Sequence, residues 1–103
     1  MSTNDMQVAK TILEQLGGAG RLAAMLGAKN FVGSEDALQF RFAAKATNGA
    51  NSIRVVLDPT DTYTVEFWSI RGLDCRKVAS QEGVYDDVLR STIEAETGLR
   101  LSL

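Results

Sequence analysis

The stretch 37-ALQFRFAAKATNGANSIRVVLDPTDTYTVEF-67 decides the fold of this chain. Apolar and polar residues alternate in three parts of it, which is typical of β-strands with one buried face. These parts are 38–42, 53–57 and 63–67. We therefore expect an antiparallel meander whose apolar side chains all lie on one face of the sheet.

The first connection of the meander contains the dipeptide NG at 48–49, which is favoured in two-residue hairpin turns. A hairpin centred there predicts that Phe42 lies opposite Val55. It also predicts that Phe40 lies opposite Leu57. Apolar side chains would then meet across the two strands, in agreement with the alternation.

The second connection, DPTDT at 58–62, suits a three-residue loop. That loop places Leu57 opposite Tyr63, so apolar side chains again meet. A two-residue loop would turn the apolar face of one strand outward. We therefore expect the three-residue loop, with Asp61 in the left-handed conformation that aspartate tolerates.

Two helices are expected before the strands. Apolar residues recur at helical spacing over 3–16, and Asn4 followed by Gln7 resembles a capping box. A second, short helix is expected over 19–26, with Gly27 as its C-terminal stop. The close spacing of the two helices indicates a tight helical corner.

A fourth strand is expected over 73–79, after the three strands of the meander. Its register stays open. Pairing Val78 with Val65 joins two apolar residues, but the same register places Arg76 against Phe67. The sequence alone does not choose between these consequences.

A last helix is expected over 84–97, with Asp86 and Asp87 in its first turn, where the helix dipole favours acids. Gly98 suits a C-terminal cap, and alternating leucines follow it. The chain is therefore predicted to form a single α+β domain over 1–103. Its two N-terminal helices and C-terminal helix would cover one face of a four-stranded antiparallel meander.

The uncovered face of such a sheet is open to a partner. Trp68 on this face suits stacking on a nucleic-acid base or anchoring a protein, and the alternative is a tryptophan tucked under the tail or a loop. Arg54 falls opposite Glu66, which predicts a cross-strand ion pair. The residues expected on the open face are Gln39, Arg41, Arg54, Val56, Thr64, Glu66 and Trp68.

Composition excludes much chemistry. The 103 residues contain no histidine, which removes Ser-His-Asp and Cys-His catalysis and most catalytic zinc sites. The single cysteine, Cys75, has no internal disulfide partner and fits a reducing compartment. The polar start MSTNDMQVAK lacks a hydrophobic signal region. We expect a cytoplasmic protein that is not an enzyme, with no metal, no cofactor and no membrane partner.

The glycine-rich segment GAGRLA at 18–23 matches a dinucleotide-binding fingerprint with a terminal alanine. That fingerprint requires a preceding strand and a parallel βαβ unit, whereas here a helix precedes it and antiparallel strands follow. The segment GAKN at 27–30 lacks the Ser or Thr and the spacing of a phosphate loop. These glycines are therefore interpreted as a joint between two helices.

Charge is unevenly distributed along the chain although the net charge is only −2. Basic residues predominate over 21–54, and acidic residues predominate over 82–96. Such a bipolar surface would suit a charged partner. The acids of the second segment are Glu82, Asp86, Asp87, Glu94 and Glu96.

Four segments carry a family resemblance: ILEQLGG (12–18), MLGAKNF (25–31), DTYTVEF (61–67) and GVYDDVLRSTIEAETGL (83–99), the last with its closing LSL. Together they resemble a small domain family of phages, prophages and plasmids, and the type II-A anti-CRISPR proteins. The resemblance implies an inhibitor of an RNA-guided CRISPR nuclease that acts by binding, without catalysis. It carries over no catalytic motif.

Two partner hypotheses follow. In the first, the acidic segment contacts the nuclease or its nucleic-acid complex, since such nucleases hold nucleic acid in basic channels. Its candidate residues are Glu82, Asp86, Asp87, Glu94 and Glu96. In the alternative, the chain is a nucleic-acid-binding accessory protein of a phage or plasmid, and its open sheet face uses Arg41, Arg54 and Trp68.

Overall fold

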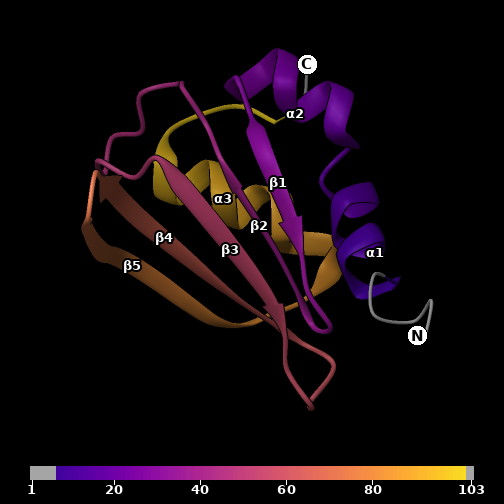
Figure 1. Ribbon diagram of the computed structural model, residues 1–103. Helices are drawn as coiled ribbons and strands as arrows, with labels where there is room; N and C mark the ends of the chain where they lie inside the picture. Colours follow the sequence, from indigo (N-terminus) through magenta and orange to yellow (C-terminus); the bar gives the residue numbers. More distant parts are fainter. Residues whose placement is uncertain (1–6, 102–103) are drawn as a thin grey trace.

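The computed structural model describes residues 7–101 (Figure 1). The fold is α+β, as predicted, but its antiparallel sheet has five strands rather than four. The elements in chain order are α1 (Gln7–Gln15), α2 (Ala19–Leu26), β1 (Lys29–Gly33), β2 (Ala37–Arg41), β3 (Ser52–Leu57), β4 (Tyr63–Arg71), β5 (Asp74–Val84), the 3₁₀ helix η2 (Asp86–Val88) and α3 (Leu89–Thr97).

The strands form a simple meander in the order β1-β2-β3-β4-β5. The strand missing from the prediction is β1, which pairs with β2 at one edge of the sheet. Its apolar residues Phe31 and Val32 are adjacent rather than alternating, and Asn30 adopts a φ of 57° within a register shift. This irregular edge strand therefore lacks the period-two pattern on which a strand prediction depends.

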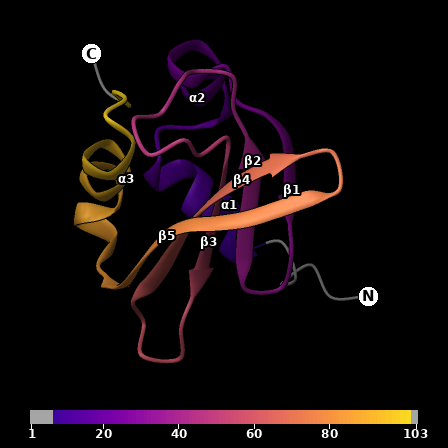
Figure 2. The ribbon, with the colours of Figure 1, turned by 90° about the vertical axis from the view of Figure 1, so that its left-hand side faces the viewer.

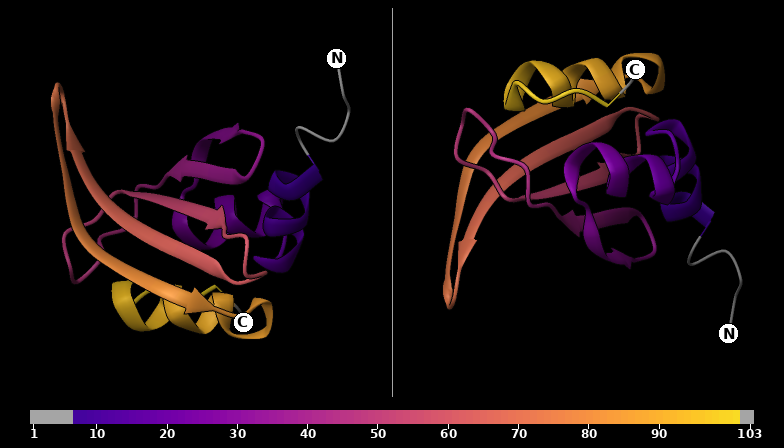
Figure 3. Two further views of the ribbon diagram at one scale, coloured as in Figure 1. Left: turned by 90° about the horizontal axis from the view of Figure 1, so that it is seen from below. Right: turned by 90° about the horizontal axis from the view of Figure 1, so that it is seen from above.

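The strands β4 and β5 are the longest and form a hairpin that projects from the sheet (Figure 2). Helix α3 lies toward the β5 side of the domain, whereas α1 and α2 lie toward β1 and β2 (Figure 3). Buried side chains from all three helices and from one face of the sheet join a single core. The helices therefore cover one sheet face, as expected, and leave the other open.

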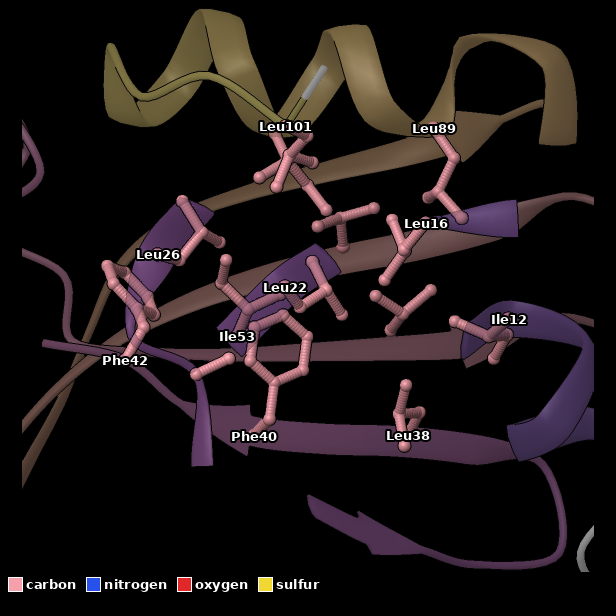
Figure 4. Packing of buried hydrophobic residues seen from close by; sticks show 14 of the residues in the cluster. Ile12, Leu16, Leu22, Leu26, Leu38, Phe40, Phe42, Ile53, Leu89 and Leu101 are labelled. Atoms are coloured by element: carbon pink, nitrogen blue, oxygen red, sulfur yellow. The ribbon is translucent and has the colours of Figure 1, made fainter. Parts of the chain in front are cut away.

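The core is built from side chains that approach one another from helices and strands (Figure 4). Phe40 and Ile53 from the sheet meet Ile12 and Leu22 from the helices, and all four are fully buried. Leu101, which follows α3, is also fully buried and points into this core (Figure 4). The tail after α3 therefore closes the core.

The predicted register between β3 and β4 is confirmed. Leu57 pairs with Tyr63, and Val55 pairs with Val65. Asp61 adopts the left-handed conformation, with a φ of 64°. The amide of Asp58 donates to the carbonyl oxygen of Thr62 at 2.8 Å and closes the loop.

The predicted register between β2 and β3 is wrong. Phe40 pairs with Ile53 rather than with Leu57, and the second predicted pair of this hairpin is likewise absent from the register. The NG dipeptide at 48–49 lies within a longer loop instead of forming a two-residue hairpin turn. The shift is by an even number of residues, so the apolar side chains stay on the core face.

The physical reason for this shift is that the loop between β2 and β3 docks onto helix ends. The amides of Ala43 and Ala44 donate to the carbonyl oxygen of Leu26, at 3.1 and 2.9 Å. The amide of Thr47 donates to the carbonyl oxygen of Thr97 at 2.8 Å. The loop therefore satisfies carbonyl groups at the C-terminal ends of α2 and α3, and these long-range bonds outweigh the local turn preference.

The open question about the fourth predicted strand is resolved against the pairing of Val78 with Val65. Phe67 pairs with Ala79 and Trp68 pairs with Lys77, so Val78 is the extra residue of a bulge. The strand is also longer than the predicted 73–79, because it extends to residue 84.

The helix predictions hold in part. The bounds of α2 are those predicted, and α1 begins at Gln7 in the described chain, which does not include Asn4 of the suggested capping box. Gly27 and Gly98 cap α2 and α3 in the left-handed conformation, as expected. The last helix is shorter than predicted, because β5 runs to residue 84 and a 3₁₀ turn precedes α3.

Replacing Gly98 by alanine is expected to lower the free energy of unfolding by about 1–2 kcal/mol, because Gly98 has a φ of 72°. A Cβ at this position would lie 2.9 Å from Cγ2 of Thr47. Urea unfolding of Gly98→Ala with and without Thr47→Ala separates the two effects. Full recovery by Thr47→Ala would contradict backbone strain as the main cost.

Candidate functional site

The open sheet face contains a groove of about 520 Å³. Four strands contribute to it, because β2 to β5 place alternate residues on this face. Its lining residues are Gln39, Arg54, Val56, Glu66, Trp68, Ile70 and Cys75. The groove thus brings together an aromatic ring, two charged groups and apolar walls, which is a composition typical of ligand-binding pockets.

Trp68 lies in this groove and is half-buried. Its Nε1 donates a hydrogen bond to Oε1 of Glu66 at 3.1 Å. The Nζ atom of Lys77, its cross-strand partner, lies 6.0 Å from the centroid of the indole ring, at the limit of a cation–π contact. Neighbours on its own face of the sheet therefore orient the ring, and the ring lines the groove.

Arg54 and Glu66 are cross-strand partners, as predicted. The predicted ion pair between their side chains is not confirmed, and the carboxylate of Glu66 instead accepts the hydrogen bond from the indole of Trp68. Arg54 lines the groove beside Glu66 and Trp68 and supplies the positive charge of the groove lining.

Arg41 stands apart from the groove lining. Its Nη2 donates to the carbonyl oxygen of Ile70 at 3.3 Å, which fixes the guanidinium against β4 near the hairpin end. The structure therefore brings Arg54 and Trp68 together and places Arg41 at the adjacent end of β2.

Asn51 is a structural residue of this face that the sequence analysis missed. Its Nδ2 donates to the carbonyl oxygen of Ile70 at 2.8 Å, and its Oδ1 accepts the amide of Ile70 at 2.9 Å. Just before β3 begins, the side chain of Asn51 therefore makes the pair of hydrogen bonds to Ile70 that the backbone of a neighbouring strand would make. No local pattern reveals this role, because the partner lies 19 residues away.

The end of the sheet that lies opposite the turn between β4 and β5 is acidic. The connection between β1 and β2, the connection between β3 and β4, and the segment after β5 all lie there, because neighbouring strands are antiparallel. The amide of Leu57 donates to the carbonyl oxygen of Asp36 at 2.8 Å and joins the first two. We name this surface the acidic end; its residues are Glu35, Asp36, Asp58, Asp61, Glu82, Asp86 and Asp87.

The five predicted acids divide between two regions. Glu82, Asp86 and Asp87 are exposed at the acidic end. Asp86 and Asp87 lie in η2, not in the first turn of an α-helix as predicted. Glu94 and Glu96 lie on α3 and bind within the chain, so they do not join the other three.

The contacts of these two glutamates are intramolecular. Oε2 of Glu94 accepts the amide of Leu101 at 2.8 Å, and Oε2 of Glu96 accepts Nε2 of Gln81 at 3.4 Å. Glu94 therefore anchors the buried tail. This role follows from tertiary contact, which charge counting along the sequence does not reveal.

Asp86 also acts on a neighbouring group. Burial raises the pKa of the Tyr63 hydroxyl above its ordinary value of 10.0, the side chain of Gln15 opposes this rise, and the charge of Asp86 adds to it. Tyr63 therefore stays neutral near pH 7, and the negative charge of this end resides on the carboxylates.

Among residues 7–101, no group of three or more Cys, Asp or Glu side chains is arranged to hold a metal ion. None of the helices in this range is long and apolar enough to cross a membrane. No protein-family model, curated protein or solved structure matches the chain.

Proposed function

We propose that this protein is an anti-CRISPR inhibitor of a type II-A RNA-guided nuclease, encoded by a phage or another mobile element, and that it acts by stoichiometric binding in the cytoplasm of a bacterial host. The observation that carries the proposal is the acidic end. Three segments distant in the sequence meet at this end of the sheet, and all of their acids except Asp58 are exposed, since the carboxylate of Asp58 accepts Oγ1 of Thr64 at 2.6 Å. A basic nucleic-acid channel would attract such a surface.

The local composition supports this choice of surface. Residues 33–37, 57–63 and 82–88 contain seven carboxylates and neither lysine nor arginine. Neighbouring like charges make the local potential stronger than the net charge of −2 indicates. Complementary charge accelerates encounter with a basic partner and favours one orientation.

The test is DNA cleavage by a purified type II-A nuclease and its guide RNA, with this protein in excess. We expect cleavage to stop. The variant Glu82→Gln/Asp86→Asn/Asp87→Asn should raise the concentration for half-inhibition about 10- to 100-fold, because each exposed charge pair contributes roughly 0.5–1 kcal/mol. Glu14→Gln on α1 is the matched control and should change nothing. Undiminished cleavage at excess wild-type protein would refute the proposal.

A second candidate function rests on a different observation, the presence of Trp68 and Arg54 in one groove. In this function the chain is a nucleic-acid-binding accessory protein whose open face holds a single strand. A base would stack on the indole, and phosphates would contact Arg54 and Arg41.

Titration of labelled single-stranded DNA and RNA at low salt tests this function. Binding should weaken with rising salt, because phosphate contacts release counterions. Trp68→Ala should weaken binding about tenfold or more, since one base stacked on an aromatic ring contributes about 1–3 kcal/mol. Equal binding by Trp68→Ala would exclude the groove as the binding site.

A further inference from the structure

The hairpin of β4 and β5 extends past the end of the sheet. Ser52, the first residue of β3, pairs with Trp68, and beyond that pair the β4–β5 ladder continues over 69–71 and 74–76. At about 3.4 Å per residue, these three pairs extend roughly 10 Å. We name this two-stranded extension the ribbon; it projects clearly in Figure 2.

The base of the ribbon is braced. The side chain of Asn51 binds both the amide and the carbonyl oxygen of Ile70, and Arg41 donates to the same carbonyl oxygen. These bonds act where β3 no longer supports β4. The ribbon is therefore presented in a fixed direction, which lowers the conformational entropy lost when it binds a partner.

The tip of the ribbon is a two-residue turn, since Arg71 pairs with Asp74. Gly72 supplies the positive φ of 60° that the first position of such a turn requires. The second position commonly holds a polar residue such as Asn, Asp or Ser. Here it holds Leu73, whose exposed fraction is 103%. This leucine contributes no buried surface to the core, so its apolar surface is available to a partner.

Three cations follow the hairpin from its tip to its base. Arg71 and Arg76 lie on the face of the ribbon that continues the helix-covered side, and Lys77 lies at the base of the ribbon on the other face, paired with Trp68. All three are exposed. Arg71 also lines a hollow of about 330 Å³ together with Lys45 from the loop between β2 and β3. Asp74 is the one acid among residues 69–77.

We propose that the ribbon binds duplex DNA by entering the minor groove, with Leu73 as an apolar wedge between base pairs and the flanking cations on the two phosphate backbones. The minor groove is about 7.5 Å deep and only about 6 Å wide, so a projection of roughly 10 Å reaches its floor only where the duplex is kinked and unstacked. Minor-groove proteins insert leucine in this way and kink the duplex. An apolar tip, with two arginines on one face of the ribbon and Lys77 on the other face at its base, suits a groove between two lines of phosphates.

This inference goes beyond both functions above, because neither the acidic end nor the binding of a single strand involves Leu73. A protein partner with an apolar pocket is the competing occupant. The charge favours DNA, because Arg71, Arg76 and Lys77 outnumber Asp74 between the tip and the base of the ribbon, and a polyanion neutralises all three together.

The test measures binding of the full chain to a duplex of about 20 base pairs that carries 2-aminopurine beside a flexible TA step. We expect the logarithm of the association constant to fall linearly with the logarithm of the salt concentration. The slope should be about −2.7, for three phosphate contacts. Fluorescence of 2-aminopurine should rise as the step unstacks. Leu73→Ser should remove that rise and weaken binding about tenfold at an unchanged salt slope.

Charge and apolar controls complete the experiment. Arg71→Gln or Arg76→Gln should reduce the salt slope by about 1, whereas Arg90→Gln at the start of α3 should not. Val32→Ser, which removes an exposed apolar side chain from β1, should leave both readouts unchanged.

Four outcomes would overturn the inference. They are the absence of salt-dependent duplex binding at about 50 mM salt, wild-type binding by Leu73→Ser, stronger binding to the separated strands than to the duplex, and loss of nuclease inhibition in Leu73→Ser without any duplex binding. The third would favour the open-face groove, and the fourth would favour a protein pocket around Leu73. Cleavage inhibition that persists in Leu73→Ser leaves the proposed anti-CRISPR function standing, so the two proposals fail separately.

Discussion

Replacing Phe40 by alanine is expected to lower the free energy of unfolding by about 3–5 kcal/mol. Phe40 is fully buried in β2, and its ring centroid lies 5.5 Å from that of Phe31. The substitution removes one of the two largest fully buried side chains of the core and leaves a cavity that surrounding groups fill only in part. At about 4–8 °C per kcal/mol for a domain of this size, the melting temperature should fall by more than about 12 °C.

Urea and thermal unfolding, followed by circular dichroism, measure this effect. Phe40→Leu keeps most of the apolar volume and should lose clearly less stability. Val32→Ala is the matched control on the adjacent strand; because Val32 is 60% exposed, it should change the free energy of unfolding by less than about 0.5 kcal/mol. A loss below about 1 kcal/mol for Phe40→Ala would mean that β2 is not central to the core.

The two hairpins show how far local sequence determines register. The loop between β3 and β4 is short, and one loop length alone keeps Leu57 opposite Tyr63 with both apolar faces aligned. Local turn chemistry and burial therefore agree there, and the prediction succeeded. In the hairpin of β2 and β3, the NG dipeptide favoured one register, whereas contacts with Leu26 and Thr97 stabilise another.

The helix ends were predictable for a related reason. Gly27 and Gly98 act through their own backbone conformation, which the residue type reveals directly. The bulge at Val78 and the edge strand β1 depend instead on which strand lies alongside, so no local period marks them.

The candidate sites likewise contain features that the local sequence predicts and features that depend on tertiary contacts. Period-two alternation was sufficient to place Arg54 and Trp68 on one sheet face, where they share a groove. It did not reveal that Glu66 binds the indole or that Asn51 braces Ile70. Only part of the acidic end could be predicted from the sequence. Glu35 and Asp61 join it through the topology of the sheet rather than through proximity in the chain.

Leu101→Ala is expected to lower the free energy of unfolding by about 2–5 kcal/mol, nearly as much as a central core substitution. Leu101 lies beyond the last helix, where exposure and tolerance to change are usual. It is nevertheless fully buried, and its amide is held by the carboxylate of Glu94 at 2.8 Å. Hydrogen exchange should report faster opening of α3 in this variant, because the tail closes the core beneath that helix.

Glu94→Ala tests the hydrogen bond that holds the tail separately from the burial of the Leu101 side chain. It removes a charge-assisted acceptor from a backbone amide and should lower the free energy of unfolding by about 1–3 kcal/mol. Asp87→Asn, an exposed acid of the same C-terminal region, is the matched control and should change the free energy by less than about 0.5 kcal/mol. If Glu94→Ala is as stable as Asp87→Asn, the tail is held by Leu101 alone. If Leu101→Ala is also neutral, the tail does not close the core, and Glu94 returns to the set of acids available for a partner.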